Sequence, residues 1–379
     1  MSLDLLSAAL IVLAGSLSSL DDVRPAPTEL VAASFNIRYG TASDGPDRWH
    51  LRRQRCIEAI RACDADILGL QEALRFQVNE IADALPEHVW VGVGRDDGAD
   101  GGEFAPIFVS RGKFEIIEHG TFWLSDTPEQ PGSRSWGNDL PRICTWVRLA
   151  TTMQTRPGGP DGPAGVDAPD GPPDATPTGV RDAPRTLLRV FNTHLDHRSQ
   201  ASRERSAAAI RAAIEAVPRE ELVLVLGDLN AGPENPAFTT LLHGARAGAL
   251  RPEDEGDGAA RAGAPAATGE SAPPADAPTA VRSDVPAAPA SAAAPGPPRS
   301  SDRPLHDAWR VANPEAPERG TAHGFRGEPT TGRIDVIFVD PRLTVLSATI
   351  DQAKRDGRFP SDHFAVIARL SLPARLSAP

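Results

Sequence analysis

The sequence predicts an α/β protein in which two β-sheets pack face to face and helices lie on their outer sides. Strand-like and helix-like segments alternate along the 379 residues. The strand-like runs outnumber the helical ones by about three to one, which is too many strands for one doubly wound sheet. Two packed sheets with helices outside accommodate that ratio.

The strand-like runs are short and rich in β-branched and aromatic residues. They fall at residues 30–37, 67–71, 89–93, 107–110, 114–118, 144–149, 187–195, 222–227, 333–339 and 363–370. Helical character is found at residues 49–63, 75–85 and 202–217. The last helix is expected to begin at Ser202 and to end before Pro218, because a serine start and a proline stop are common helix signals.

Two stretches differ in composition from the rest. Residues 153–184 are rich in Gly, Pro and Asp, and residues 244–303 are rich in Ala, Pro and Gly. Neither contains an aromatic residue, so neither can bury enough apolar surface to offset chain entropy. We expect both to be disordered insertions in one domain spanning residues 29–373, followed by a tail at 374–379. A domain boundary at the second stretch is the alternative, although residues 304–379 contain few elements for a separate core.

The segment 1–28 contains an apolar run from Leu5 to Leu20. This run is shorter than the roughly 20 residues of a comfortable transmembrane helix. It is a candidate signal peptide or anchor, although no Lys or Arg precedes it. We expect export to the periplasm or the medium in preference to a cytoplasmic location, and no stable membrane span.

Charge and cysteine content exclude further classes. The formal net charge is −12, from 39 Lys and Arg against 51 Asp and Glu. Sequence-independent duplex binding relies on basic residues that replace phosphate counterions, so extended duplex nucleic acid is not expected as a partner. Cys56, Cys63 and Cys144 form neither a disulfide framework nor a zinc-site spacing, and we expect them to be core residues.

Side chains suited to catalysis recur at or near the ends of the predicted strands, where α/β folds gather functional groups. These side chains are Asn36, Glu72, His194, Asp196, Asp228, Asn230, Asp335, Asp362 and His363. Carboxylates, amides and histidines of this kind suit a hard divalent cation, and we expect Mg²⁺, with Mn²⁺ as a substitute. Any one of them has a plain structural explanation, such as a turn at Asp228 or an Asx turn at Asn36. Their combination argues against coincidence.

The combination resembles the endonuclease/exonuclease/phosphatase superfamily, which includes DNase I-like nucleases. The motifs are Ser-Phe-Asn36, Leu-Gln-Glu72, Asn-Thr-His194-Leu-Asp196, Gly-Asp228-Leu-Asn230, Arg-Ile-Asp335 and Ser-Asp362-His363. The segments around Arg95, Glu103, Trp123 and Arg142 are similar to a bacterial branch described only as metal-dependent hydrolases. The resemblance implies a four-layer α-β-β-α sandwich of two mostly antiparallel sheets, and cleavage of a phosphate ester by metal-activated water.

The resemblance also implies roles for single residues. Glu72 is the main metal ligand, with Asn36 beside it and Asp362 completing the site. Asp335 orients His363, which acts as general base or positions the attacking water. Asp228 and Asn230 hold the nucleophile and a phosphoryl oxygen. His194, paired with Glu103, stabilises or protonates the leaving oxygen.

Three further residues are candidate substrate contacts. Arg142 is a candidate phosphate clamp, because a guanidinium donates to phosphate with two N–H groups. Asp196 lies in the His194 motif, and Trp136 lies in a Gly- and Ser-rich loop where an exposed indole could stack on a ligand. Packing in the core is the alternative for Trp136.

Three different functions compete with this interpretation. The segment from Asn192 to His197 nearly matches the zinc-binding signature of metallo-β-lactamase-type hydrolases, but Asn192 replaces its first histidine and no later histidine pattern supports it. The same fold could also serve a non-specific nuclease or a non-catalytic binding module. We expect a monomeric phosphodiesterase or phosphomonoesterase that acts on a phosphate ester. The sequence does not identify the substrate or decide between one metal ion and two.

Overall fold

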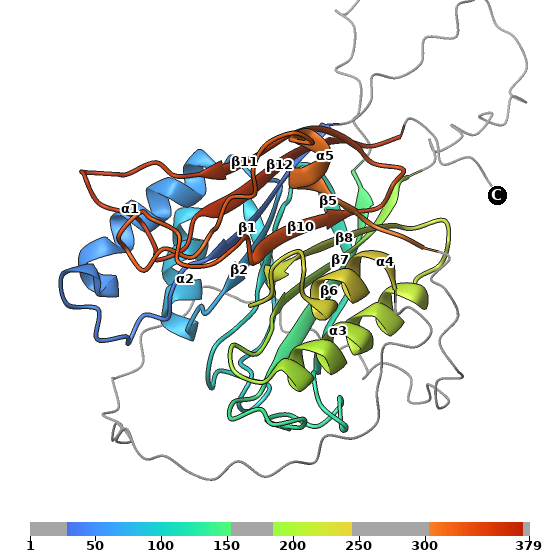
Figure 1. Ribbon diagram of the computed structural model, residues 1–379. Helices are drawn as coiled ribbons and strands as arrows, with labels where there is room; N and C mark the ends of the chain where they lie inside the picture. Colours follow the sequence, from blue (N-terminus) through green and yellow to red (C-terminus); the bar gives the residue numbers. More distant parts are fainter. Residues whose placement is uncertain (1–28, 153–184, 245–302, 374–379) are drawn as a thin grey trace, which may run out of the picture.

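The computed structural model describes residues 29–152, 185–244 and 303–373, which form two β-sheets and their covering helices (Figure 1). One sheet contains β1 (Glu29–Asn36), β2 (Ile67–Gln71), β3 (His88–Val91), β4 (Ile107–Ser110), β11 (Thr344–Asp351) and β12 (Ala365–Ser371). The other contains β5 (Phe114–Trp123), β6 (Ile143–Thr151), β7 (Leu187–His194), β8 (Leu222–Asp228), β9 (His306–Asp307) and β10 (Asp335–Val339).

The strands pair mostly in antiparallel fashion. The first sheet has the order β11-β12-β1-β2-β4-β3, and the second has the order β5-β6-β7-β8-β10-β9. Among the described strands, β1 with β2 and β7 with β8 are the parallel pairs. The prediction of two mostly antiparallel sheets is therefore confirmed.

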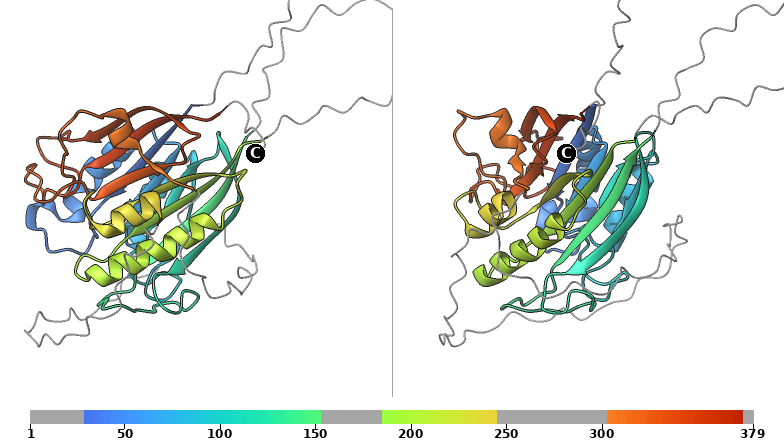
Figure 2. Two further views of the ribbon diagram at one scale, coloured as in Figure 1. Left: turned by 45° about the vertical axis from the view of Figure 1, so that its right-hand side comes forward. Right: turned by 90° about the vertical axis from the view of Figure 1, so that its right-hand side faces the viewer.

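Three apolar clusters hold the layers together. The facing sides of both sheets form the central cluster, which includes Ile67, Leu224 and Val366. The helices α1 (Trp49–Ala62) and α2 (Arg75–Ala84) cover the outer face of the first sheet. The helices α3 (Gln200–Glu215) and α4 (Pro236–His243) cover the outer face of the second. Figure 2 shows the helices on the outside of the two sheets, as the predicted α-β-β-α sandwich requires.

The central strands are apolar on both faces because both faces are covered. In β1, Leu30 and Ala32 belong to the cluster between the sheets, and Ala33 and Phe35 belong to the cluster under α1 and α2. Side chains alternate between the faces of a strand, so a continuous apolar run is the pattern expected of a strand buried on both sides.

Several predicted boundaries were wrong. Strand β5 continues to Trp123 through a bulge between Ile116 and Glu118, where the prediction ended. Helix α3 begins at Gln200 rather than at Ser202, because Ser199 is the N-cap and its hydroxyl accepts the backbone N–H of Ser202 at 3.1 Å. The sequence also failed to predict β9, β11, α4, the short helix α5 (Ala308–Ala312) and a 3-10 turn (Gly45–Asp47).

The predicted terminal segments and both insertions lie outside the described residues, except at the borders of the second insertion. There Arg303, expected to belong to that insertion, is buried and donates to the carbonyl of Val217 at 2.8 Å. The three cysteines are buried and free, as expected. Among the described helices, none has the length and apolar character needed to cross a bilayer.

Described residues that flank the two undescribed internal ranges lie at one edge of the sheets. At the first range, the backbone N–H of Thr151, at the end of β6, donates to the carbonyl of Thr186, just before β7, at 3.0 Å. At the second, Arg303 contacts Val217, shortly before β8 begins. The opposite edge carries the ends of β1, β2, β7 and β8, and the polar residues predicted to be catalytic lie there.

Candidate active site

Strand register brings the predicted residues of both sheets to one edge. In the second sheet, Asp228 pairs with His194 on one side and with Asp335 on the other. Because β10 is antiparallel to β8, the start of β10 lies beside the end of β8. In the first sheet, Asn36 ends β1 and Glu72 follows β2, its parallel neighbour.

Asp228 lies at the centre of this group. Its buried carboxylate oxygen Oδ2 accepts the Nδ2 amide of Asn36 at 2.9 Å. The same oxygen is 3.7 Å from His194 Nε2 and 3.8 Å from His363 Nδ1. Burial alone would raise the pKa of Asp228, but the two histidines and its hydrogen bonds lower it, so the carboxylate stays ionised. Two imidazoles therefore flank one buried negative charge.

His363 and Asp335 form a buried pair. His363 Nδ1 lies 2.9 Å from Asp335 Oδ2, and both side chains are at least nine-tenths buried. Burial favours the neutral imidazole, but Asp335, Asp228 and Asp362 outweigh it and raise the pKa of His363 well above its usual value. Because Nδ1 is engaged by Asp335, Nε2 is the ring nitrogen left for a reacting group.

His194 lies near Glu103, its predicted partner, but not within hydrogen-bond distance. His194 Nδ1 is 3.7 Å from Glu103 Oε2, and that oxygen instead accepts Arg95 Nη1 at 2.6 Å. Burial opposes ionisation of Glu103, yet His194, Arg95 and Arg142 lower its pKa to about 2. Glu103 is thus a carboxylate held by an arginine beside the imidazole.

Glu72 occupies a strained position next to Asn36. Its backbone has φ of 61°, in the left-handed region that residues other than glycine seldom adopt. Glu72 Oε1 accepts Asn36 Nδ2 at 3.1 Å, and Oε2 accepts the backbone N–H of Tyr39 at 3.0 Å. Asn36 Oδ1 accepts the backbone N–H of Arg38 at 3.0 Å. Asn36 therefore links Glu72 to Asp228 through its amide group.

The donors around Glu72 fit a hard divalent cation. Glu72 and Asp362 each place a carboxylate oxygen within 4.0 Å of the guanidinium of Arg38, so both carboxylates lie beside the same side chain. Oxygen donors of this kind are those that Mg²⁺ and Mn²⁺ take. A second set of donors, Asp228, Asp335 and His363, has ligand atoms within 4.8 Å of one another. Both sets lie at the same edge of the sheets.

Arg142 and Asp196 lie together and are buried. Arg142 Nε is 3.4 Å from Asp196 Oδ1, and Arg142 Nη1 is buried without a hydrogen-bond partner among the described residues. Asp196 Oδ2 accepts the backbone N–H groups of Arg198 and Ser199 at 2.9 and 2.6 Å. Asp196 therefore also shapes the turn that leads into α3.

Asn230 and Trp136 are placed differently from the central group. Asn230 Nδ2 donates to the carbonyl of Leu195 at 3.0 Å, and its backbone N–H donates to Asp228 Oδ1 at 2.9 Å. Trp136 packs against the cluster under α3 and α4, and its indole N–H donates to Asp126 at 2.9 Å. No contact joins Trp136 to the central group among the described residues.

Sequence reasoning assigned no role to three residues that lie within the site. Arg38 lies beside Glu72 and Asp362, Arg95 holds Glu103, and His197 Nδ1 is 2.9 Å from Arg142 Nη2. A guanidinium has donors only, so His197 Nδ1 must accept; burial and Arg142 both lower the pKa of His197. For Arg38 and His197 a signal existed, since each lies within three residues of a predicted site residue at a strand end.

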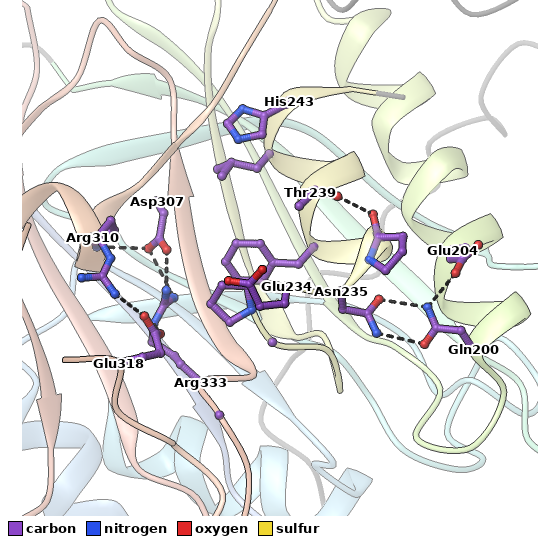
Figure 3. A pocket seen from close by; sticks show the side chains of 16 residues that line it. Gln200, Glu204, Glu234, Asn235, Thr239, His243, Asp307, Arg310, Glu318 and Arg333 are labelled. Carbon is purple, nitrogen blue, oxygen red and sulfur yellow. Dashed lines mark hydrogen bonds and ion pairs between the residues drawn. The ribbon is translucent and has the colours of Figure 1, made fainter. Parts of the chain in front are cut away.

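A pocket of about 1010 Å³ adjoins the site between α3, α4 and the segment that precedes β10. Its lining, within the described residues, includes none of the predicted catalytic or metal-binding side chains. Figure 3 shows Arg333 between Asp307 and Glu318, with which it forms ion pairs. Arg333 is fully buried and lies two residues before Asp335. These ion pairs therefore fix the chain that carries Asp335 into the site.

Comparison with known proteins identifies the family. The chain matches the model of the Endonuclease/Exonuclease/phosphatase family over residues 33–363, which is most of its length. A comparison with curated protein sequences gave no match.

Solved structures show the same architecture. An endonuclease/exonuclease/phosphatase family protein from Bacteroides thetaiotaomicron is 25% identical, with a TM-score of 0.62, and the match covers 92% of this chain and 99% of that one. A mannosyl-6-phosphatase from the same organism is also 25% identical, with a TM-score of 0.61 and coverage of 90% and 99%. The human nocturnin catalytic domain, at 13% identity, a TM-score of 0.54 and coverage of 92% and 94%, is similar in fold only. The sandwich is DNase I-like, and the chain belongs to the endonuclease/exonuclease/phosphatase family of hydrolases.

Proposed function

We propose that the protein is a metal-dependent phosphoesterase that transfers the phosphoryl group of a small phosphate ester to water. The observation that carries this proposal is the pair of imidazoles, His194 and His363, on either side of the buried carboxylate of Asp228. Ester hydrolysis needs one group that accepts a proton from water and another that supplies a proton to the leaving oxygen. Two histidines at one edge provide both functions.

We assign His363 as the group that accepts a proton from the attacking water. Asp335 holds Nδ1 of its ring at 2.9 Å, which fixes the orientation of the imidazole and leaves Nε2 facing the reacting water. The water oxygen forms the new P–O bond, and its proton passes to His363. We assign the ionised carboxylate of Asp228 to accept a hydrogen bond from the water, and the side-chain amide of Asn230 to donate one to a phosphoryl oxygen.

We assign His194 as the group that donates a proton to the leaving oxygen. When the ester P–O bond breaks, the departing alkoxide takes a proton from the imidazole, so the products are an alcohol and inorganic phosphate from a monoester, or an alcohol and a phosphomonoester from a diester. Glu103 lies 3.7 Å from His194, and its low pKa keeps a negative charge there that stabilises the imidazolium before transfer. Arg142, buried near Glu103 and Asp228, faces the phosphoryl oxygens with a guanidinium.

Glu72, Asp362 and Asn36 are the residues that we assign to the cation, supported by the approach of both carboxylates to Arg38 and by the hydrogen bond from Asn36 to Glu72. A bound Mg²⁺ or Mn²⁺ would neutralise charge on the phosphoryl oxygens and make the water more acidic. The donor set is made of oxygen atoms, which these ions prefer. A mannosyl-6-phosphatase among the similar structures is consistent with a phosphate-ester substrate.

Chelation gives the direct test of this function. Purified full-length protein should hydrolyse members of a panel of sugar phosphates, nucleotides and phospholipids with Mg²⁺, and EDTA should lower the rate by at least about 100-fold. Adding excess Mg²⁺ or Mn²⁺ should restore the rate. Hydrolysis that persists in EDTA would contradict the metal assignment, and a protein that binds phosphate esters without hydrolysing any of them would be the non-catalytic binding module.

Salt dependence distinguishes a small substrate from a polymer. The net charge of −12 does not favour a duplex, and Arg38, Arg95 and Arg142 each pair with a carboxylate. We expect the rate with a small ester to change less than about threefold between 50 and 200 mM salt, whereas a duplex-binding nuclease loses about 10³-fold or more in affinity. Plasmid DNA cleavage with that steep salt dependence would favour a nuclease.

A further inference from the structure

Arg38 follows β1 and lies beside the two carboxylates assigned to the cation. Its Nη1 is 4.0 Å from Glu72 Oε2, and its Nε is 3.7 Å from Asp362 Oδ2. Both distances exceed hydrogen-bond length, so the guanidinium is close to these carboxylates without being bound to either. Its positive charge therefore lies next to the two carboxylates assigned to the cation.

Asp44 holds the guanidinium from the other side. Arg38 Nε and Nη2 each donate to one oxygen of Asp44 at 3.1 Å, a bidentate arrangement that fixes the plane of the group. Within the described residues, Arg38 Nη1 donates no hydrogen bond, and the Arg38 side chain is 28% exposed. A guanidinium has five N–H donors, so three remain for an anion.

The backbone of Arg38 is held in a costly conformation. Its φ is 60°, in the left-handed region. The carbonyl accepts Arg52 Nη2 at 2.9 Å and Gln77 Nε2 at 3.0 Å, and both of these side chains are fully buried. The N–H donates to Asn36 Oδ1 at 3.0 Å. Buried polar groups thus maintain a strained backbone at the residue that carries the charge.

We propose that Arg38 binds a non-bridging oxygen of the substrate's phosphoryl group and selects a terminal phosphate over a phosphodiester. This inference rests on the proposed function. A terminal phosphate is a dianion near neutral pH, and a diester is a monoanion, so a cation at a given distance attracts the first about twice as strongly. Arg142, which precedes β6 in the other sheet and interacts electrostatically with Asp228, supplies a second guanidinium at this edge.

The test compares two esters that share a leaving group. Wild-type protein and Arg38→Gln are assayed with 4-nitrophenyl phosphate and with bis(4-nitrophenyl) phosphate in Mg²⁺. We expect kcat/KM to fall about 100-fold for the monoester and less than about fivefold for the diester. Calorimetric titration with inorganic phosphate in Mg²⁺ should show a Kd at least about tenfold weaker in the variant. In titrations with Mn²⁺ alone, the Kd for Mn²⁺ should differ between the variant and wild-type protein by less than about threefold, because Arg38 is not a ligand of the cation.

Controls separate this role from general damage. Arg53→Gln removes an exposed ion pair between Arg53 on α1 and Glu80 on α2 and should leave every value unchanged. Equal losses with both esters, or an unchanged phosphate Kd, would overturn the assignment of Arg38. If Arg38→Gln does not fold, Asp44→Asn is tested instead, because it weakens the contact that orients the guanidinium. It should reduce the monoester rate by a larger factor than the diester rate. An equal reduction of both rates would overturn the proposal.

The two proposals fail in different ways. If wild-type protein hydrolyses neither ester and no member of the panel described above, but binds phosphate, and Arg38→Gln loses that binding, the catalytic function is refuted and the anion-binding role of Arg38 stands. If wild-type protein hydrolyses the diester alone, the catalytic function stands and the selection of a terminal phosphate is refuted.

Discussion

Replacing His363 with alanine should lower kcat on the order of 10³-fold while the protein remains folded. The imidazole is the group assigned to the proton of the attacking water, and general acid–base groups contribute about 10² to 10⁴ in rate. His363 is also held by Asp335 at 2.9 Å, so its nitrogen is already oriented when the substrate binds. The measurement is steady-state hydrolysis in saturating Mg²⁺, with thermal melting to verify folding.

A matched histidine supplies the control. His306 is exposed on β9 and pairs with Val339, at the end of β10 opposite to Asp335, so His306→Ala should leave kcat unchanged. A His363→Ala variant that melts normally and retains more than about a tenth of wild-type kcat would show that this imidazole is not the base.

The pH dependence of the rate gives a further test of the role of His363. Because neighbouring carboxylates raise the pKa of His363, a reaction that needs its neutral form should speed up as pH rises through that raised pKa. Asp335→Asn removes one of those charges, lowers the pKa and should move the rising limb to lower pH. If the rate of Asp335→Asn rises over the same pH range as that of wild-type protein, a group other than His363 controls the rise.

Replacing Glu72 with glutamine should abolish activity by weakening the binding of the cation. The substitution preserves shape and keeps an acceptor for the backbone N–H of Tyr39, but it removes the negative charge. Changes outside the ligand shell of a metal already cost about 10–100-fold in affinity, so loss of the ligand itself should cost at least about 100-fold. Calorimetry with Mn²⁺ and the Mg²⁺ dependence of the rate both measure this effect.

The control for Glu72 is an acid remote from the site. Glu87 is exposed between α2 and β3, and Glu87→Gln should retain wild-type Mn²⁺ affinity. If Glu72→Gln bound Mn²⁺ as tightly as wild-type protein, the cation would have to be held elsewhere, and Asp228, Asp335 and His363 would be the next set to test.

The arrangement of the catalytic edge could be predicted because strand ends are visible in sequence. The motifs ending in Asn36, Glu72, His194 and Asp228 each follow an apolar strand, and parallel pairing of β1 with β2 and of β7 with β8 brings those ends together. The role of Asn36 as a link between Glu72 and Asp228 needed coordinates, because it depends on which atom of the amide faces which carboxylate.

Other parts escaped prediction for physical reasons. Strand β11 is half exposed and lies at the edge of its sheet, so it lacks the continuous apolar run of β1. Helix α4 begins with an Asn235 cap and Pro236, a recognisable start, but it lies directly before the second low-complexity stretch. Arg38 was passed over because the approach of its side chain to Glu72 and Asp362 depends on a left-handed backbone that no periodic pattern reveals.

The position of the β6–β7 junction at the edge opposite to the catalytic residues has a consequence for engineering. Thr151 and Thr186 are already hydrogen-bonded neighbours, so a tight hairpin could join β6 to β7 directly, and a long linker could do so equally well. Closing a longer loop costs only about 0.6 kcal/mol per doubling of its length. This junction is therefore a natural place for an affinity tag, a fluorescent reporter or a grafted recognition module, which would leave the chemistry at the far end of the strands untouched.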